Sequence, residues 1–222
     1  MNPSPRSCPR GGGATRSAGF TLVELLAVMA ILALLVGMAI GIVSKAKATG
    51  NETACQQQLR DISLNLTTYV DQRRGGKWPK ESGIRFLLLI VKEDYYRGDV
   101  LKNFVCPSTD DQTSRAESDP PHSGITDWED LDPDCISYAG RDNANFGLRK
   151  DRLNEEVVAC DDNWYQGAGR PNHDGVTIVV YGDGHIGKLN TSDYKGSLPE
   201  GQDWLPVGPE SPDESLKKLQ VD

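Results

Sequence analysis

The chain has no stripe of Lys and Arg interleaved with aromatic residues, and its acidic side chains outnumber its basic ones by 32 to 24. The formal net charge is -8. Nonspecific binding to nucleic acid needs clustered positive charge that contacts phosphates. The composition therefore argues against a nucleic-acid partner.

Motifs of catalysis and cofactor binding are also missing from the sequence. It contains no Gly-x-Ser-x-Gly, no His-Glu-x-x-His, no phosphate-binding loop and no dinucleotide-binding fingerprint. None of its five cysteines lies in a Cys-x-x-Cys pair, so a zinc ribbon is not expected. We predict a protein that is not an enzyme and that holds no resident metal or cofactor.

Hydrophobic residues are concentrated in one block, Phe20–Val43, which follows a polar, Gly/Pro/Ser-rich segment with three arginines and no acid. The 19 residues Leu25–Val43 are uncharged and would span about 28 Å as a helix, close to the ~30 Å hydrocarbon core of a bilayer. We predict a targeting leader over residues 1–19 and then a transmembrane helix with its N-terminus in the cytoplasm.

An ordinary secretory signal peptide is the alternative interpretation of this block. Ala46-Lys47-Ala48 resembles the small-residue cleavage site of such a signal. The apolar run, however, is longer than the ~7–15 residues that a signal peptide uses. We therefore favour the membrane helix.

Glu24 is the one charged residue within the apolar block. A carboxylate in an apolar membrane helix is costly, so it needs either solvent at the membrane surface or a positive partner. Gly37 and Gly41 lie four residues apart farther along the helix, a spacing that permits close helix approach or arises by chance.

The run Gly19-Phe20-Thr21-Leu22-Val23-Glu24, followed by an apolar helix, resembles the type IV prepilin processing motif. The resemblance implies that a prepilin peptidase cleaves after Gly19 and N-methylates Phe20. It also implies that Glu24 pairs with the terminal amine of a neighbouring subunit during assembly. Such pairing is physically reasonable, because an unpaired charge in a dry filament core would be strongly destabilising.

A helical pattern continues beyond the apolar block. Apolar residues recur at spacings of 4, 3, 4 and 3, which is one stripe on an otherwise polar helix: Cys55, Leu59, Ile62, Leu66 and Tyr69. We expect one helix from about Thr21 to Gln72, ended by Arg73-Arg74-Gly75-Gly76. The alternative is two helices joined by a flexible hinge at Thr49-Gly50-Asn51.

Short strand signals occupy the remainder of the chain. We expect strands at four places: Phe104–Pro107, Cys135–Ala139, Val157–Cys160 and Gly175–Tyr181. The last strand should form a hairpin with His185–Leu189 through the turn Asp183-Gly184. Periodicity does not decide whether Ile84–Val91 is a helix or a strand.

The His173-X9-Asp183-Gly184 spacing resembles a C-terminal signature of pilin-like proteins from planctomycete-type bacteria. The stretches Phe104–Pro107 and Ser137–Gly140 also resemble recurring parts of that family. Together with the element order, this predicts an α+β, pilin-like fold in which one long N-terminal helix packs on a small antiparallel sheet with long loops.

Two groups of polar residues are candidates for metal sites. His173, Asp174, Asp183 and His185 would be spread along the hairpin and not converge, so we expect His173 to bond a loop carbonyl or an acid. Acid-rich residues 108–134 and Asp161-Asp162-Asn163 could supply oxygens to calcium, as loops of some resembling pseudopilins do, but they lack the Asp-x-Asp-x-Asp-Gly register. We favour a solvated acidic surface.

Cysteines give a prediction about cross-links. Removal of the leader would remove Cys8 and leave four cysteines, which permits two disulfides in an oxidising exterior. We predict the pairs Cys55–Cys106 and Cys135–Cys160, with four free thiols as the alternative.

These inferences combine into a domain plan. Residues 1–19 form the leader, 20–44 the transmembrane and assembly helix, 45–74 its amphipathic continuation, 75–196 the globular domain and 197–222 an acidic flexible tail that carries a short helical turn at Leu216–Leu219.

The predicted function is structural. The chain would be a single-pass protein of the cytoplasmic membrane with a periplasmic domain, and a subunit of a type IV pilus-like filament or type II secretion pseudopilus. Its partners would be copies of itself, other pilins or pseudopilins, the secretion or pilus machinery and the prepilin peptidase. The rivals are a membrane-tethered binding module that does not polymerise and a secreted enzyme with a His/Asp metal site.

Overall fold

A computed structural model describes most of the chain after the predicted leader. The described residues are 21–93, 95, 99–109, 128, 131, 136–161, 172–173, 175–198 and 200–221. The chain divides into two compact units, Met1–Lys45 and Ala46–Asp222.

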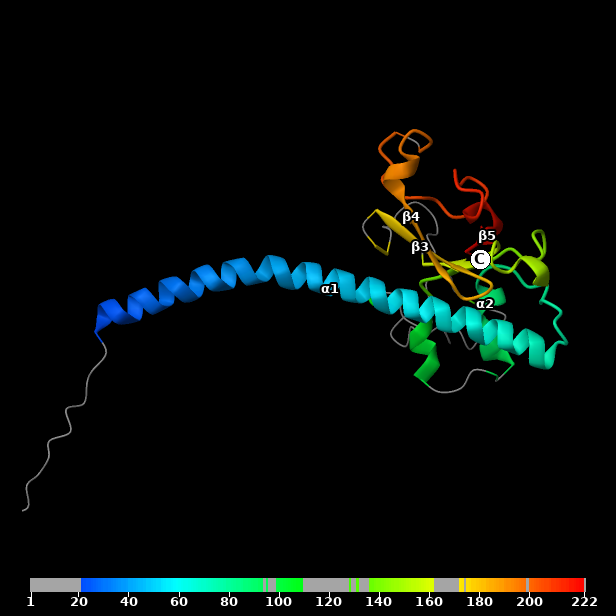
Figure 1. Cartoon of the computed structure of the whole chain (residues 1–222), viewed down its shortest axis with the longest axis horizontal. Helices are drawn as coiled ribbons and strands as arrows, with labels where there is room; N and C mark the ends of the chain where they lie inside the picture. The colour runs from blue at the N-terminus through cyan, green and yellow to red at the C-terminus, as the bar shows by residue number, and fades with distance from the viewer. Residues whose placement is uncertain are drawn as a thin grey trace, which may run out of the picture. The chain divides into compact units, whose positions relative to one another are not determined.

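Helix α1 runs without a break from Leu22 to Arg73, as predicted, and stays helical through Gly50, so the hinge alternative is wrong (Figure 1). No proline interrupts this stretch, and Leu, Ala and Met, which favour helix, are frequent in it. Its end is a glycine cap. Gly75 and Gly76 have positive φ values of 61° and 77°, a conformation that favours glycine and ends the helix, and the Gly76 N–H donates to the Val70 carbonyl at 2.9 Å.

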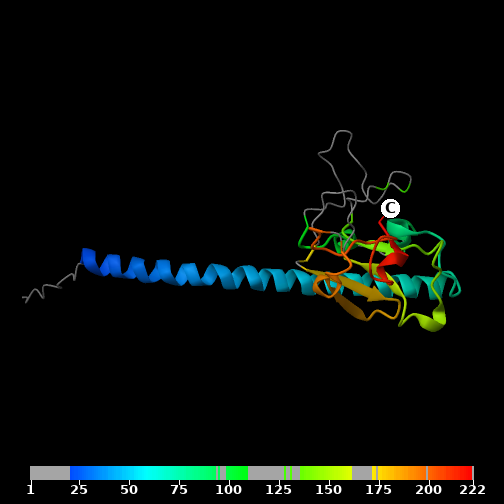
Figure 2. The same cartoon turned by 90° about the horizontal axis from the view of Figure 1, so that it is seen from above.

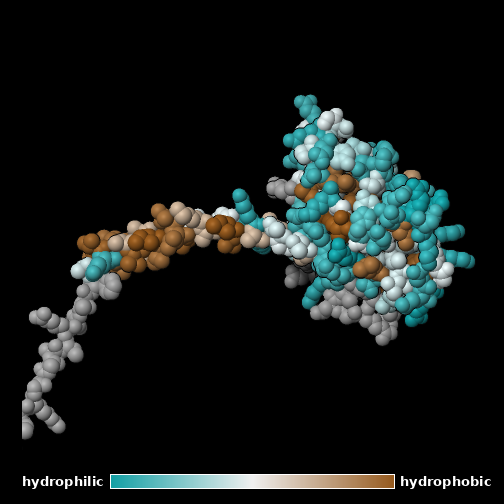
Figure 3. All heavy atoms as spheres, viewed as in Figure 1, coloured by the Kyte–Doolittle hydropathy of each residue, from teal (hydrophilic) through white to brown (hydrophobic). Residues whose placement is uncertain are grey.

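The first unit contains the apolar half of α1. Hydrophobic residues gather along this half, as Figure 3 shows, and their side chains are exposed within the described chain. Leu22 is 74% exposed and Ile42 is 70% exposed. This helix is the one, among the described residues, that is long and apolar enough to cross a membrane.

The second unit is built on a five-stranded antiparallel sheet of order β4-β3-β2-β1-β5 (Figures 1 and 2). The strands are β1 (Ala139–Arg141), β2 (Val157–Cys160), β3 (Val176–Tyr181), β4 (Ile186–Asn190) and β5 (Leu219–Gln220). Strands β3 and β4 form the hairpin expected from Asp183-Gly184. The predicted α+β fold with one long helix and a small antiparallel sheet is confirmed.

One face of the sheet packs against helices. The stripe on the second half of α1 is fully buried with α2 (Gly83–Lys92), which settles Ile84–Val91 as a helix. Val158, Ile178 and Val180 meet this stripe from the sheet. Burial of each large aliphatic side chain stabilises the fold by roughly 1.5–3 kcal/mol.

Residues of the C-terminal segment cover the other face, contrary to the prediction of a flexible tail at 197–222. Leu205, Leu216 and Leu219 are buried against Val157 and Val179. The segment also supplies β5, which pairs with β1. Residues 200–221 therefore belong to the folded unit, because the sheet is apolar on both faces and needs a second cover. The short helical turn was predicted correctly and is the 3-10 helix η6 (Leu216–Lys218).

Two predicted strands differ from the structure. No strand occurs at Phe104–Pro107: Phe104 instead ends the 3-10 helix η1 (Asp99–Phe104), and Pro107 lies in a turn. The strand expected at Cys135–Ala139 begins only at Ala139 as β1. Cys135 and most of residues 108–134 lie outside the described residues.

Gly140 gives a direct test of how α2 packs on the sheet. A Cβ at this position would overlap the carbonyl oxygen of Gly83 and lie 2.9 Å from Leu87 Cγ. Because backbone cannot yield as a flexible side chain does, we expect Gly140→Ala to lower the free energy of unfolding by about 1–3 kcal/mol or more.

Denaturant unfolding of the purified chain measures this effect. Gly147→Ala is the matched control, since the nearest atom to its Cβ would be the Asn143 oxygen at 3.8 Å. Equal stability of the two variants would contradict the packing described here.

Candidate functional site

Glu24 begins α1 with a reciprocal hydrogen-bond pair. Its Oε2 accepts from the Thr21 backbone N–H at 2.9 Å and from the Thr21 hydroxyl at 2.8 Å. The Glu24 N–H donates to Thr21 Oγ1 at 3.3 Å. This arrangement is a capping box, which satisfies amide donors that the helix itself leaves unpaired.

The Thr-x-x-Glu spacing is a sequence signal for this cap. We did not use this signal and expected Glu24 either to be solvated or to pair with a positive charge. The cap gives the carboxylate a partner while the chain is a single subunit. Gly19 and Phe20, the predicted processing residues, lie outside the described residues. At Gly37 and Gly41, apart from the neighbouring residues and backbone of the helix itself, no described atom lies within 4 Å of the position that a Cβ would occupy.

A group of polar and thiol side chains lies inside the second unit. Cys55 comes from the stripe of α1, Cys106 from the turn after η1, Asp161 from the end of β2 and His173 from the segment before β3. All four are buried. We refer to them as the Cys–His–Asp cluster.

Distances within the Cys–His–Asp cluster are short. The two sulfur atoms and one ring nitrogen of His173 all lie within 4.8 Å of one another. Cys106 Sγ is 3.5 Å from His173 Nε2, and the same nitrogen is 3.5 Å from Asp161 Oδ2. Asp161 Oδ2 is also 4.0 Å from Cys55 Sγ.

The surroundings favour the thiolate form of Cys106. A hydrogen bond from Cys55 and then one from His173 outweigh burial and lower the pKa of the Cys106 thiol to about 5. The Ser108 N–H also points at this sulfur, at 3.5 Å. Nearby, burial raises the pKa of the Tyr138 hydroxyl far above its ordinary value. The interior of the unit thus holds a buried sulfur whose surroundings favour the thiolate, which is the form in which cysteine binds metals.

The two ends of the His-X9-Asp-Gly spacing lie in different environments. His173 faces the Cys–His–Asp cluster, and its contact with Asp161 fits the expectation that it bonds an acid. Asp183 instead pairs with His185, Oδ1 to Nδ1 at 2.6 Å, in the exposed turn after β3. Gly184 has a φ of +86° in this turn, a conformation that favours glycine.

The His/Asp set considered from sequence therefore does not form one site among the described residues. Asp174 and Asp162-Asn163 lie outside them. Sequence reasoning also missed the grouping of His173 with two cysteines, since Cys55 and Asp161 are 106 positions apart and Cys106 and His173 are 67 apart.

Neither of the predicted disulfides is formed among the described residues. The structure brings Cys55 and Cys106 together, as their predicted pairing requires, but both are free thiols in it. Cys160 is buried on β2, while Cys135 lies outside the described residues. Both disulfides stay predictions.

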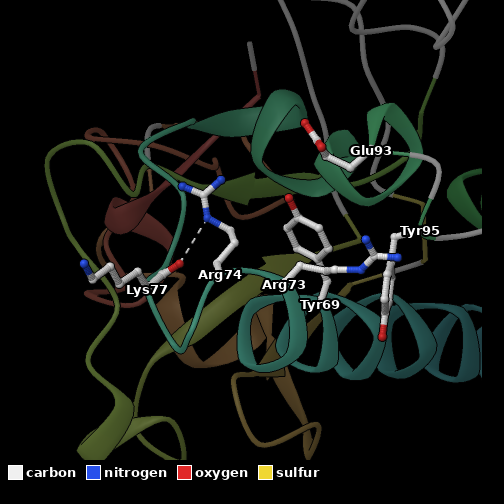
Figure 4. Close-up of a pocket in the computed structure, with 6 residues that line it drawn as sticks. All are labelled: Tyr69, Arg73, Arg74, Lys77, Glu93 and Tyr95. Atoms are coloured by element: carbon white, nitrogen blue, oxygen red, sulfur yellow. Dashed lines mark hydrogen bonds between the residues drawn. The ribbon is translucent and has the colours of Figure 1, made fainter.

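A cavity of about 470 Å³ lies where α1 ends (Figure 4). It is lined by Tyr69, Arg73, Arg74, Lys77, Glu93 and Tyr95. The Tyr69 and Tyr95 rings meet edge to face with centroids 5.4 Å apart. Basic residues are favourable at a helix C-terminus because the helix dipole is negative there, so their presence does not require an anionic ligand.

The capping box predicts a local effect of Thr21→Ala. Loss of an N-cap hydroxyl costs about 1 kcal/mol, so amide exchange in the first turn of α1 should accelerate about fivefold. Hydrogen–deuterium exchange of the detergent-solubilised chain would measure it. Ser44→Ala is the control, because the Ser44 hydroxyl donates to the Gly41 carbonyl within the helix and caps nothing. Unchanged exchange in Thr21→Ala would contradict the cap.

Comparison with known proteins gives a match near the N-terminus. Residues 14–40 match the family model of the prokaryotic N-terminal methylation motif. No curated protein and no solved structure matches the chain. The matched residues contain the expected processing run and the first part of the exposed apolar helix, so this motif supports a prepilin-like protein that a prepilin peptidase processes and that associates with a membrane.

Proposed function

We propose that the chain is a structural subunit of a type IV pilus-like filament or a type II secretion pseudopilus. A prepilin peptidase cleaves it between Gly19 and Phe20 and methylates the new N-terminus, and the helix then packs into the filament. The observation that carries this proposal is the methylation motif at residues 14–40 on an apolar helix whose side chains have no cover within the described chain.

Exposed apolar surface on this scale requires a cover. Lipid supplies it while the subunit is in the membrane, and the helices of neighbouring subunits supply it in a filament. The second half of α1 needs no cover from lipid or from other subunits, because the sheet and α2 already bury its apolar stripe. Membrane and assembly functions are therefore assigned to residues 20–44, with the folded unit in the periplasm.

Glu24 provides the register for assembly. In the single chain its carboxylate accepts from Thr21. Cleavage at Gly19 adds a charged amine at Phe20, and a staggered neighbour would present that amine to Glu24 in place of water. Two opposite charges buried together are far less costly than either alone, so this pairing selects one axial offset between helices.

Glu24→Gln separates the charge from the cap. Gln serves in a capping box as Glu does, so helix initiation should be kept while the charge is lost. We expect the variant to be processed and membrane-inserted but to lose filament assembly, measured by sheared-filament recovery and by cross-linking between subunits. Thr21→Ala is the matched control, since it loses the cap hydroxyl but keeps the charge and should still assemble.

Assembly of Glu24→Gln at the level of the unmodified chain would contradict the pairing. If the unmodified chain also yields no filament, the membrane-tethered binding module is the better account, and the cavity at the end of α1 is the place to look for its ligand. Processing is checked separately: mass spectrometry of the mature chain should find one added methyl group on Phe20.

A further inference from the structure

The Cys–His–Asp cluster is not explained by the proposed filament role. It lies in the folded unit, whereas assembly is assigned to residues 20–44. Two thiols, an imidazole and a carboxylate are grouped in the interior, with Cys55, Cys106 and Asp161 at 0% exposure and His173 at 8%. Side chains of this polarity are seldom placed together in a core unless something satisfies them.

Their spacing can be compared with that of ligands around a tetrahedral ion. With Zn–S near 2.3 Å and Zn–N and Zn–O near 2.1 Å, tetrahedral angles put S and N about 3.6 Å apart, N and O about 3.4 Å apart and S and O about 3.6 Å apart. The corresponding distances are 3.5 Å for Cys106 and His173, 3.5 Å for His173 and Asp161, and 4.0 Å for Cys55 and Asp161. The ligand atoms of Cys55, Cys106 and His173 all lie within 4.8 Å of one another, and Asp161 Oδ2 approaches two of them, Cys55 and His173, which makes it the candidate for the fourth ligand.

The surrounding backbone holds these ligands in place. Asp161 Oδ1 accepts from the Ile178 N–H at 2.7 Å, which leaves Oδ2 on the side of Cys55 and His173. The Cys106 N–H donates to Ser137 Oγ at 2.9 Å, and the Ser108 N–H is directed at the Cys106 sulfur. Hydrogen bonds of this kind orient the ligands in metal sites.

The four residues of the Cys–His–Asp cluster come from different parts of the fold, so an ion bound to them would link these parts. Cys55 belongs to α1, Asp161 follows β2, and His173 precedes β3. Asn172, the neighbour of His173, donates through Nδ2 to the carbonyls of Ser137 and Asp161. These bonds hold Asn172, and with it the adjacent His173, beside the cluster.

We propose that Cys55, Cys106, His173 and Asp161 form a structural zinc site. Thiolate and imidazole ligands select zinc over calcium or magnesium, which require oxygen ligands. Four protein ligands leave no open position for water or substrate, so the site stabilises the fold and performs no reaction. Zinc and a Cys55–Cys106 disulfide exclude each other, because both use the same two sulfur atoms.

Zinc content of the full chain, purified in detergent from cells grown with zinc, tests the proposal. We expect stoichiometric zinc by mass spectrometry of the metal, and a fall in melting temperature when a chelator removes it. Titration of the metal-depleted chain with Co²⁺ should give the visible absorption of tetrahedral, thiolate-bound cobalt. This spectrum reports on the wild-type chain and so does not depend on any variant folding.

Two histidine variants form a matched pair. His173→Asn should lose bound zinc and the cobalt spectrum, whereas His185→Asn should keep both, because His185 lies in the exposed turn with Asp183. Asp161→Asn should weaken zinc binding by about tenfold to a hundredfold. The proposal is overturned if the wild-type chain binds neither metal, if a Cys55–Cys106 disulfide is found in peptide mass maps, or if His185→Asn loses metal as fully as His173→Asn.

Discussion

Burial of the stripe on the second half of α1 is the interaction on which the folded unit depends. Leu59, Ile62 and Leu66 are fully buried in one cluster with residues of α2 and of the sheet. The same helix carries polar bonds that fix its register: the Ser63 hydroxyl donates to the Tyr181 carbonyl at 2.9 Å, and Thr67 donates to the Gly182 carbonyl at 3.1 Å. Apolar burial supplies most of the stabilisation, and these bonds select one placement of helix against hairpin.

The sequence was most informative where a pattern is local and periodic. The stripe on α1, the glycines that end it and the Asp183-Gly184 hairpin each follow from neighbours in the chain, and the structure confirms them. The Phe104–Pro107 strand was wrong because a short apolar run has no period, and its surroundings made Phe104 the end of a 3-10 turn. The C-terminal cover was missed because only a few apolar residues, such as Leu205, stand among Pro, Gly and acids.

The Cys–His–Asp cluster shows a different limit of sequence reasoning. Each ligand follows an unrelated local pattern, and Cys55 by its spacing is only one more member of an apolar stripe. The pairing of β2 with β3, the packing of α1 and the hydrogen bond from the Cys106 N–H to Ser137 bring the four side chains together. The spacing of a motif can reveal a site whose residues come from one loop. A site assembled from distant segments can be recognised only once the fold is known.

The position of β5 affects how the protein matures. This strand follows the other four in the sequence, and it closes the edge of the sheet along β1. The apolar helix leaves the ribosome long before β5 does, so it can enter the bilayer while the edge of β1 is still open. With the proposed topology, the domain completes its sheet only after β5 has crossed the membrane, and until then the open edge can pair with other chains or be held by a chaperone.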